Sequence, residues 1–95
     1  MTERQAWTFL SNHTHVLLCI AQNPNARVRD IALGVGITER GVQRIITELE
    51  DEGVLAKERR GRRNHYVIDG SLPLRHELES HRKTGELLRF LGRDT

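Results

Sequence analysis

The sequence predicts a mainly α-helical fold with a small β-hairpin, and three features of the 95 residues support this fold class. Apolar residues recur at helical spacing in three successive segments of the first half of the chain. Two short stretches with strand character follow, and an arginine- and glycine-containing turn separates them. A leucine-bearing segment ends the chain. We therefore expect a single domain over residues 1–95, with a three-helix core, a two-stranded hairpin and a C-terminal helix.

The composition argues against a disordered chain and against a membrane protein. Hydrophobic residues make up 37% of the sequence and charged residues 29%, so the chain has enough apolar side chains to form a folded core. The longest apolar run, Val16 to Ala21, falls far short of the roughly 20 residues that span a bilayer. The N-terminus lacks a basic stretch followed by an apolar one of signal-peptide length. We expect a cytoplasmic protein.

Start and stop signals define the three helices, which we expect at about 12–22, 29–34 and 38–52. An Asn-Pro-Asn sequence ends the first helix, and a glycine-containing turn separates the second helix from the third. Thr38 is placed to cap the third helix, because its hydroxyl can accept a hydrogen bond from a free amide of the first turn. Gly53 is placed to end that helix. A short helix, a glycine turn and a capped helix form the helix-turn-helix signature.

The third helix has two faces of different chemistry. At about 100° per residue, one face is apolar and carries Val42, Ile45, Ile46 and Leu49. The nearly opposite face carries Arg40, Gln43, Arg44 and Thr47. Arginine donates two hydrogen bonds to guanine, glutamine pairs with adenine, and threonine contacts a thymine methyl or a phosphate. This pattern favours insertion into a major groove of DNA. The alternative is an ordinary solvated face of an amphipathic helix.

The hairpin, expected over 54–68, carries the densest positive charge in the chain. Its tip, 60–63, and the adjoining strand ends contribute Arg59, Arg60, Arg62, Arg63 and Asn64. Arginines on a projecting hairpin can follow the phosphate backbone, which gives affinity with little sequence information. The net charge of the chain is only +2, so the cluster indicates one directed contact with a polyanion. A basic tip can also serve solubility alone.

Residues of about 13 to 68 resemble the winged helix-turn-helix of bacterial regulators in the MarR-like and ArsR-like group. The matching positions are Arg29 to Ala32, Val35 to Thr38, Val42, Ile45, Leu49, Glu50, Gly53 to Leu55, Arg59, Gly61, Arg62, Asn64 and Tyr66. The resemblance implies that the third helix reads the major groove, that the hairpin is the wing and that the protein is a homodimer.

The function expected from residues and resemblance together is sequence-specific binding of double-stranded DNA by a transcriptional regulator. The regulator is a repressor or an activator, and repression is favoured. The expected major-groove residues are Thr38, Glu39, Arg40, Gln43, Arg44 and Thr47. A winged-helix module that binds a protein through its basic wing is the alternative. The chain lacks the long helices of the MarR ligand pocket and the cysteine-rich motif of metal-sensing ArsR proteins, so a small-molecule effector is left open.

The last segment, 72–91, is expected to form one helix that mediates dimerisation, with Pro73 in its first turn. A stripe of residues at spacings of four and three, which a second copy can cover, comprises Leu74, Leu78, His81, Gly85 and Leu88. The N-terminal arm, 1–10, can join this contact. The residues assigned to the dimer interface are Trp7, Phe9, Leu10, Leu74, Leu78, His81 and Leu88. The alternative is that the stripe packs on its own domain.

The sequence gives no signal for catalysis or for a metal. His13 and His15 do not form a chelating pair along a helix, and neither do His76 and His81. The sequence contains no nucleophile-base pattern and no glycine-rich phosphate loop. We expect no enzymatic activity, no metal and no cofactor.

Overall fold

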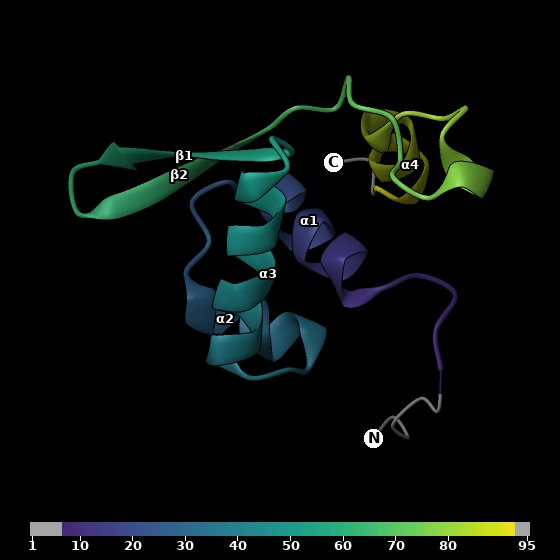
Figure 1. The fold of residues 1–95 in the computed structure, drawn as a ribbon. Helices are drawn as coiled ribbons and strands as arrows, with labels where there is room; N and C mark the ends of the chain where they lie inside the picture. The colour runs from purple at the N-terminus through teal and green to yellow at the C-terminus, as the bar shows by residue number, and fades with distance from the viewer. Residues whose placement is uncertain (1–6, 93–95) are drawn as a thin grey trace.

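The computed structural model of the chain describes residues 7–92, in which helices and a hairpin follow one another in the predicted order (Figure 1). The elements are α1 (Asn12–Gln22), α2 (Val28–Val35), α3 (Glu39–Asp51), β1 (Leu55–Arg60), β2 (Arg63–Ile68), the short 3-10 helix η1 (Glu77–Glu79) and α4 (Thr84–Leu91). The predicted fold class, mainly α with one small hairpin, is confirmed. No helix in the described part of the chain is long and apolar enough to cross a membrane.

Local hydrogen bonds explain where α1 ends but not where it begins. Ser11 occupies the N-cap position in an extended conformation, but its side chain makes no capping hydrogen bond. At the other end the amide of Asn23 donates to the carbonyl of Cys19 over 3.0 Å. The Asn23 side chain then accepts a hydrogen bond from the amide of Asn25. The chain therefore turns out of the helix at the predicted Asn-Pro-Asn sequence.

The turn between α2 and α3 is set by a glycine and a threonine. Gly36 has a φ of 89°, a left-handed conformation that side chains with a Cβ disfavour. Thr38 Oγ1 accepts a hydrogen bond from the amide of Gly41 over 3.0 Å, as predicted for the cap of α3. The helix α2 begins at Val28 and runs through Gly34 to Val35, so Gly34 lies inside the helix and not in the turn.

One hydrophobic core joins the three N-terminal helices, the hairpin and α4. Its fully buried side chains include Val16, Ile20, Ile31, Val42 and Ile45, each at most 2% exposed. Burying one such side chain stabilises the fold by about 1.5–3 kcal/mol. These residues occupy one face of each helix, which fixes the direction in which the opposite face of α3 points.

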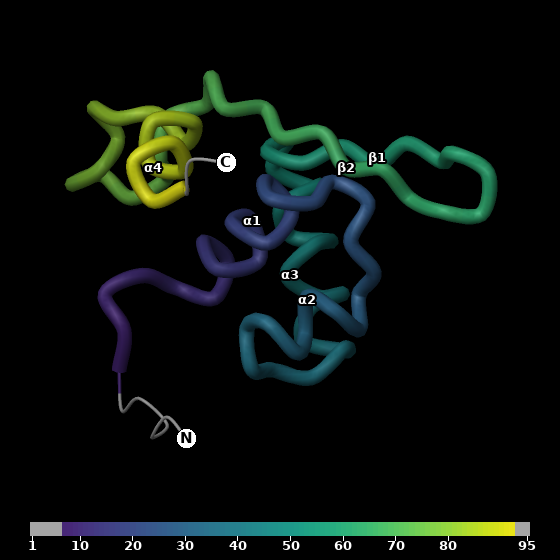
Figure 2. Tube along the Cα trace, turned by 180° about the vertical axis from the view of Figure 1, so that it is seen from behind, coloured from purple at the N-terminus to yellow at the C-terminus, as the bar shows by residue number. Residues whose placement is uncertain are grey.

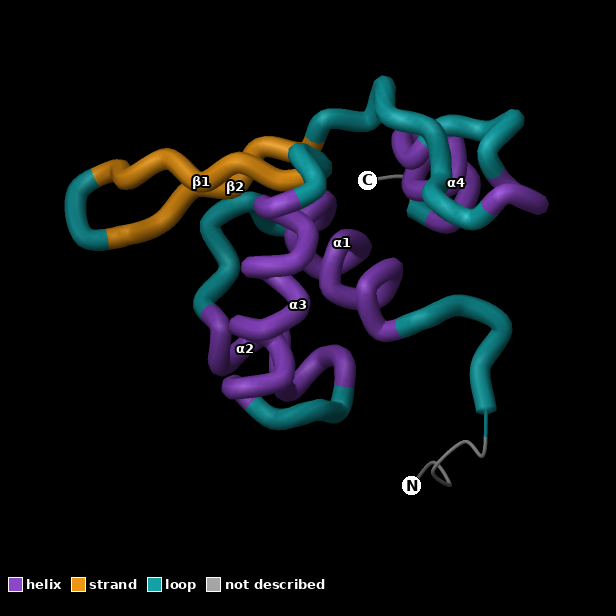
Figure 3. Tube along the Cα trace, in the orientation of Figure 1, coloured by secondary structure: helices purple, strands orange, loops and turns teal. Residues whose placement is uncertain are grey.

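The hairpin is anchored at its base and projects at its tip (Figure 3). Leu55 and Tyr66, 3% and 5% exposed, belong to the core. The amide of Tyr66 donates to the carbonyl of Pro24 over 2.9 Å, so the link between α1 and α2 covers part of the free edge of β2. Gly61, with a φ of 63°, makes the turn. The strands begin and end within a residue of the predicted bounds.

The prediction of one continuous helix over 72–91 is wrong. After the hairpin the chain forms a loop, the single turn η1 and the short helix α4, which lies beside α1 (Figure 2). The amide of Thr84 donates to the carbonyl of Leu72, and this contact closes the base of the loop. Between Leu74 and Leu87 the only aliphatic side chain is Leu78, which is 80% exposed. Because this stretch has almost nothing to bury, packing does not hold it as a helix.

The helix α4 docks where two glycines meet. The amide of Gly85 donates to the carbonyl of Gly70 over 2.8 Å, and a Cβ built on Gly85 would lie 3.0 Å from that carbonyl oxygen. The absence of a side chain at both positions lets α4 approach the end of β2. From there Leu88, 9% exposed, reaches the core.

Candidate nucleic-acid interface

The exposed face of α3 carries the polar side chains that the sequence analysis singled out. Arg40, Gln43, Arg44 and Thr47 are exposed, as is Glu39 in the first turn. The opposite face, Val42, Ile45, Ile46 and Leu49, is at most 8% exposed. Since the core fixes the buried face, the exposed face has one direction relative to the rest of the domain. The Thr38 hydroxyl oxygen is engaged in the cap, while its O–H can still donate.

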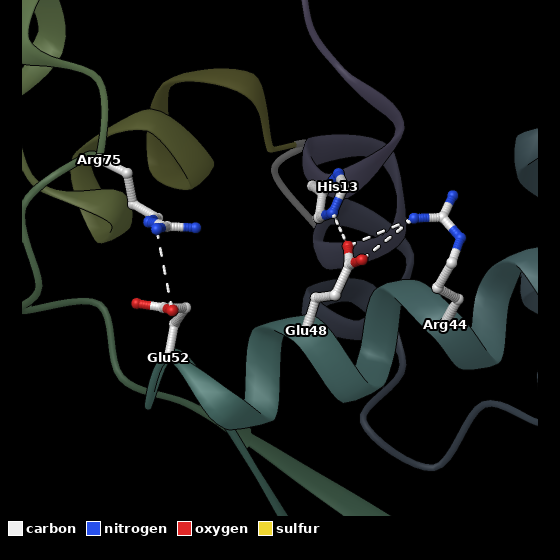
Figure 4. A network of polar contacts seen from close by, with 5 residues as sticks. All are labelled: His13, Arg44, Glu48, Glu52 and Arg75. Carbon is white, nitrogen blue, oxygen red and sulfur yellow. Dashed lines mark hydrogen bonds and ion pairs between the residues drawn. The ribbon is translucent and has the colours of Figure 1, made fainter.

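Arg44 is held by a neighbouring carboxylate (Figure 4). Its Nη1 lies 3.2 Å from Glu48 Oε2, one helical turn further on, and the Arg44 side chain is 63% exposed. His13 on α1 approaches the same carboxylate, with 2.7 Å between Nε2 and Oε1. The sequence analysis did not identify this cluster, because nothing in the spacing shows that His13 of α1 lies beside Glu48.

The hydrogen bond from His13, supported by Arg44, lowers the pKa of the Glu48 carboxyl below its ordinary value of 4.5. Glu48 is therefore ionised at neutral pH, and it partly neutralises the guanidinium of Arg44. Within residues 7–92, Arg40 forms no ion pair. The two arginines of α3 thus differ in how free they are to bind another anion.

The register of the hairpin divides its charges between two faces. Paired residues share a face, and alternate residues along a strand lie on opposite faces. The face that continues the buried Leu55–Tyr66 side carries Lys57, Arg59 and Asn64. The other face carries Glu58, Arg60, Arg63 and His65, with 3.1 Å between Arg60 Nη2 and Glu58 Oε1. Arg62 lies in the turn. Each face of the outer hairpin therefore carries exposed basic side chains, while Asn64 and His65 are half-buried.

A groove of about 330 Å³ lies between the wing and the start of α2. Its lining includes Arg62 and Arg63 from the hairpin and Arg27, which precedes α2. Arg63 reaches the carbonyl of Asn25 over 3.4 Å, and His65 meets the Asn25 side chain over 2.8 Å. These contacts hold the wing against the link between α1 and α2. The sequence analysis missed Arg27, because only the fold brings it beside the hairpin.

The residues predicted for a dimer interface are not all on the surface. Trp7 and Phe9 are 67% and 92% exposed. Their rings pack edge to face, with 4.9 Å between the ring centroids. His81 and Leu78 are exposed, whereas Leu10 and Leu74 are half-buried. Leu88 is a core residue that packs inside its own domain, so it does not offer a surface to a second copy.

The described residues also include one exposed aromatic side chain on α4 and no candidate metal site. Phe90 on α4 is 85% exposed, an apolar residue that the sequence analysis did not assign. Of the residue positions between 7 and 92, no three histidine, cysteine or acidic side chains lie close enough together to share a metal ion.

Comparison with protein families agrees with this fold. Residues 11–56 match a family model described as winged helix-turn-helix DNA-binding, a stretch just under half of the chain that covers α1 to α3 and the start of β1. With the hairpin that follows, the fold is a winged helix-turn-helix. The match supports DNA binding, and with it transcription regulation, as the function of the chain. A comparison with curated proteins finds no match.

Proposed function

We propose that the chain is a transcriptional regulator that binds double-stranded DNA sequence-specifically, with α3 in the major groove and the hairpin as a wing on the phosphate backbone. One observation carries the proposal. The exposed face of α3 presents guanidinium, amide and hydroxyl groups on a helix whose other face is locked into the core, beside a basic hairpin in a fold that matches DNA-binding domains.

Base reading belongs to Arg40, Gln43, Arg44 and Thr47 in this proposal. A bidentate pair of arginine with guanine or of glutamine with adenine contributes about 1–3 kcal/mol of discrimination. Arg44 must first leave Glu48, and exchanging an exposed ion pair costs only about 0–1 kcal/mol. A guanine contact is therefore strong enough to draw Arg44 away from its own helix.

Phosphate binding belongs to the wing and to the groove beside it. Arg59, Arg60, Arg62, Arg63 and Asn64 are the wing residues, and Arg27 extends the basic surface to the start of α2. Backbone contacts of this kind position a protein on the duplex without reading the sequence. They make the affinity depend steeply on salt concentration.

The proposal includes a homodimer on an inverted-repeat operator. Two copies would place their α3 helices in successive major grooves about 34 Å apart. The exposed Trp7, Phe9 and Leu78 support a contact between copies, since large apolar side chains gain from being covered. Light scattering of the purified chain tests this part, with a mass of twice 10.9 kDa expected.

Repression is the regulatory sign that we propose, because a bound dimer would occlude the promoter that it covers. A reporter gene behind a selected promoter tests the sign. Expression is expected to fall when the chain is present and to recover with the Arg44→Ala variant. A rise in expression would make the protein an activator.

Selection of bound genomic fragments, followed by sequencing, tests the function directly. The experiment is run at stated salt, because nonspecific binding dominates when salt is low. Enrichment of a few promoters that share an inverted repeat is the expected result. No retention of any fragment, even at low salt, would contradict DNA binding and favour a module whose basic wing meets an acidic protein.

A further inference from the structure

A second concave site lies away from the basic groove of the wing. A half-open cavity of about 670 Å³ is formed between α1, the C-terminal end of α3 and the segment 73–88. Pockets for small organic ligands have volumes of about 300–1,000 Å³. The loop and the single turn that replace the expected long helix supply one wall of this cavity, from Pro73 to Glu79.

The floor of the cavity is apolar. Leu17, Leu49, Val54 and Leu88, which are all core residues, line it together with the half-buried Leu74 and Leu87. These side chains come from α1, α3, α4 and the loops between them. Such a surface gains about 25 cal/mol for each Å² that a ligand covers.

The rim of the cavity is acidic. Its ionisable side chains are Glu48, Asp51, Glu52 and Glu79, with Arg75, His13 and His76. The lining thus holds four carboxylates and one guanidinium, and Arg44, outside the lining, pairs with Glu48. The Arg75–Glu52 pair is long, with 3.8 Å between Nη2 and Oε2, and Figure 4 shows these two side chains extending toward each other from opposite walls. The excess of negative charge favours a cation and disfavours an anion.

We propose that this cavity binds a small organic cation with an apolar body, such as an arylalkyl amine. The apolar body would cover the leucine floor, and the ammonium group would lie among the carboxylates of Glu48 and Glu52. The volume fits a molecule of this size, and the charge of the rim selects its sign. This part of the proposal does not depend on DNA binding.

Binding is coupled to DNA through Glu48, and this second part rests on the proposed function. Glu48 lines the cavity and also holds Arg44, which belongs to the face of α3 that reads DNA. An ammonium beside Glu48 competes with Arg44 for the carboxylate, and so frees Arg44 for a base. The ligand is therefore expected to raise DNA affinity, and DNA must raise ligand affinity by the same factor.

The cavity is tested first without DNA, by amide NMR titration of the full chain. The probes are phenethylamine and the larger amine diphenhydramine, with hydrocinnamate and phenethyl alcohol as matched anionic and neutral controls. Saturable shifts of the amides of Leu49, Glu52, Thr84 and Leu88 by the amines, and weaker shifts with both controls, are expected. Glu52→Gln should weaken amine binding by about two- to fivefold, while Glu77→Gln, outside the cavity, should leave it unchanged.

Three results would overturn the cavity proposal. The first is the absence of saturable shifts with either amine. The second is equal binding of amine, acid and alcohol, because charge would then play no part. The third is that the amide shifts of the cavity residues change with protein concentration but not with added amine. That result would place a second copy of the chain in the cavity.

The coupling is tested by fluorescence anisotropy on a selected DNA fragment. Diphenhydramine is expected to tighten DNA binding by about two- to fivefold in the wild type and to have no effect in Arg44→Ala. Amine binding without any change in DNA affinity would overturn the coupling and leave the cavity proposal standing. If the chain retains no DNA, the proposed function fails, while the NMR result still decides the cavity.

Discussion

Glu48 connects α1 to the exposed face of α3, and it therefore links two parts of the domain through one carboxylate. His13 and Arg44 both bind it, and its lowered pKa extends the charged form of this carboxyl to more acidic solutions. In the proposed complex Arg44 must leave this carboxylate before it binds a base, and exchanging an exposed ion pair costs about 0–1 kcal/mol. The ion pair with Glu48 therefore opposes the base contact of Arg44 by a small amount.

Replacing Arg44 by alanine is expected to weaken binding to the selected operator by about 1–3 kcal/mol and to blunt base preference. The reason is the loss of a bidentate contact to a base. The measurement is anisotropy on operator and on random DNA at the same salt concentration. Arg89→Ala on α4 is the control, and it should change neither affinity. An equal loss on both DNAs would contradict a base-reading role for Arg44.

The Glu48 cluster also makes stability depend on pH in a defined direction. Because the hydrogen bond from His13 and the contact with Arg44 lower the pKa of Glu48, folding favours its charged form. The resulting stabilisation is present above pH 4.5, the ordinary pKa, and is lost as the pH falls through the lowered value.

The variant Glu48→Gln tests this pH dependence by thermal unfolding. We expect the wild type to have the higher Tm near neutral pH, and the difference to shrink to nothing as the solution is acidified. Glu77→Gln, in which the replaced carboxylate lies outside the cluster, serves as the matched control. A difference in Tm that stays constant across the acidic range would contradict the assigned role of Glu48.

At the scale of elements, the wing is a two-stranded ribbon whose base is buried and whose tip is charged. Leu55 and Tyr66 fix it in the core, and the contacts to Asn25 steady its middle. In the proposed complex this ribbon carries its arginines to the phosphates beside the groove that α3 occupies. Its contribution to affinity should therefore be electrostatic and independent of sequence.

Replacing Arg62 by alanine is expected to weaken binding to operator and random DNA alike. Each lost phosphate contact should also reduce the slope of log affinity against log salt by about 1. Titrations of the variant and of wild type at several salt concentrations measure both effects. An unchanged salt slope would count against a wing that contacts phosphate.

The docking of α4 depends on the close approach of Gly70 and Gly85. A methyl group at Gly85 would meet the carbonyl oxygen of Gly70 at 3.0 Å, a contact that backbone atoms cannot easily relieve. Gly85→Ala is therefore expected to destabilise the fold by about 1–3 kcal/mol, measured by chemical denaturation. In Gly34→Ala the new methyl group meets Cys19 Sγ at an ordinary 3.5 Å, so this control should show no such loss.

Hydrogen exchange locates the effect of Gly85→Ala. Faster exchange is expected in α4, with α2 and α3 unchanged. Docking of α4 through the two glycines would be contradicted if Gly85→Ala had the same free energy of unfolding as the wild type. A loss of the same size in Gly34→Ala would also contradict it.

The elements differ in how far the sequence predicts them. Thr38, Gly53 and the apolar spacing of α3 are local signals, and they predict that helix to within a residue of its observed ends. The segment 72–83 has no comparable signal, because its conformation depends on tertiary contacts such as Thr84 to Leu72 and Gly85 to Gly70. Leucine spacing and Pro73 suggested a helix there, and the exposed Leu78 shows that this spacing does not form a buried face.

The same limit applies to the candidate site. Periodicity predicts which side chains lie on the exposed face of α3, since residues on one side of a helix recur at a fixed spacing. His13 at Glu48, and Arg27 at the wing, are contacts between segments distant in the sequence. No pattern along a single chain predicts such pairs.

For the whole molecule, positive and negative charge are separated although the net charge is only +2. The wing and the start of α2 form a basic side, while the end of α3 and the loop beyond it form the acidic cavity. A molecule with this distribution has an electrostatic preference for how it approaches a duplex.

Amide NMR of the full chain, titrated with a selected duplex at fixed salt, maps the surface that binds DNA. We expect the largest perturbations at Arg40, Gln43, Arg44 and Thr47 on α3 and at Arg59 to Asn64 on the wing. The amides of the loop 73–83 should change little. Perturbations confined to the cavity and α4, with the exposed face of α3 unaffected, would rule out α3 as the helix that reads DNA.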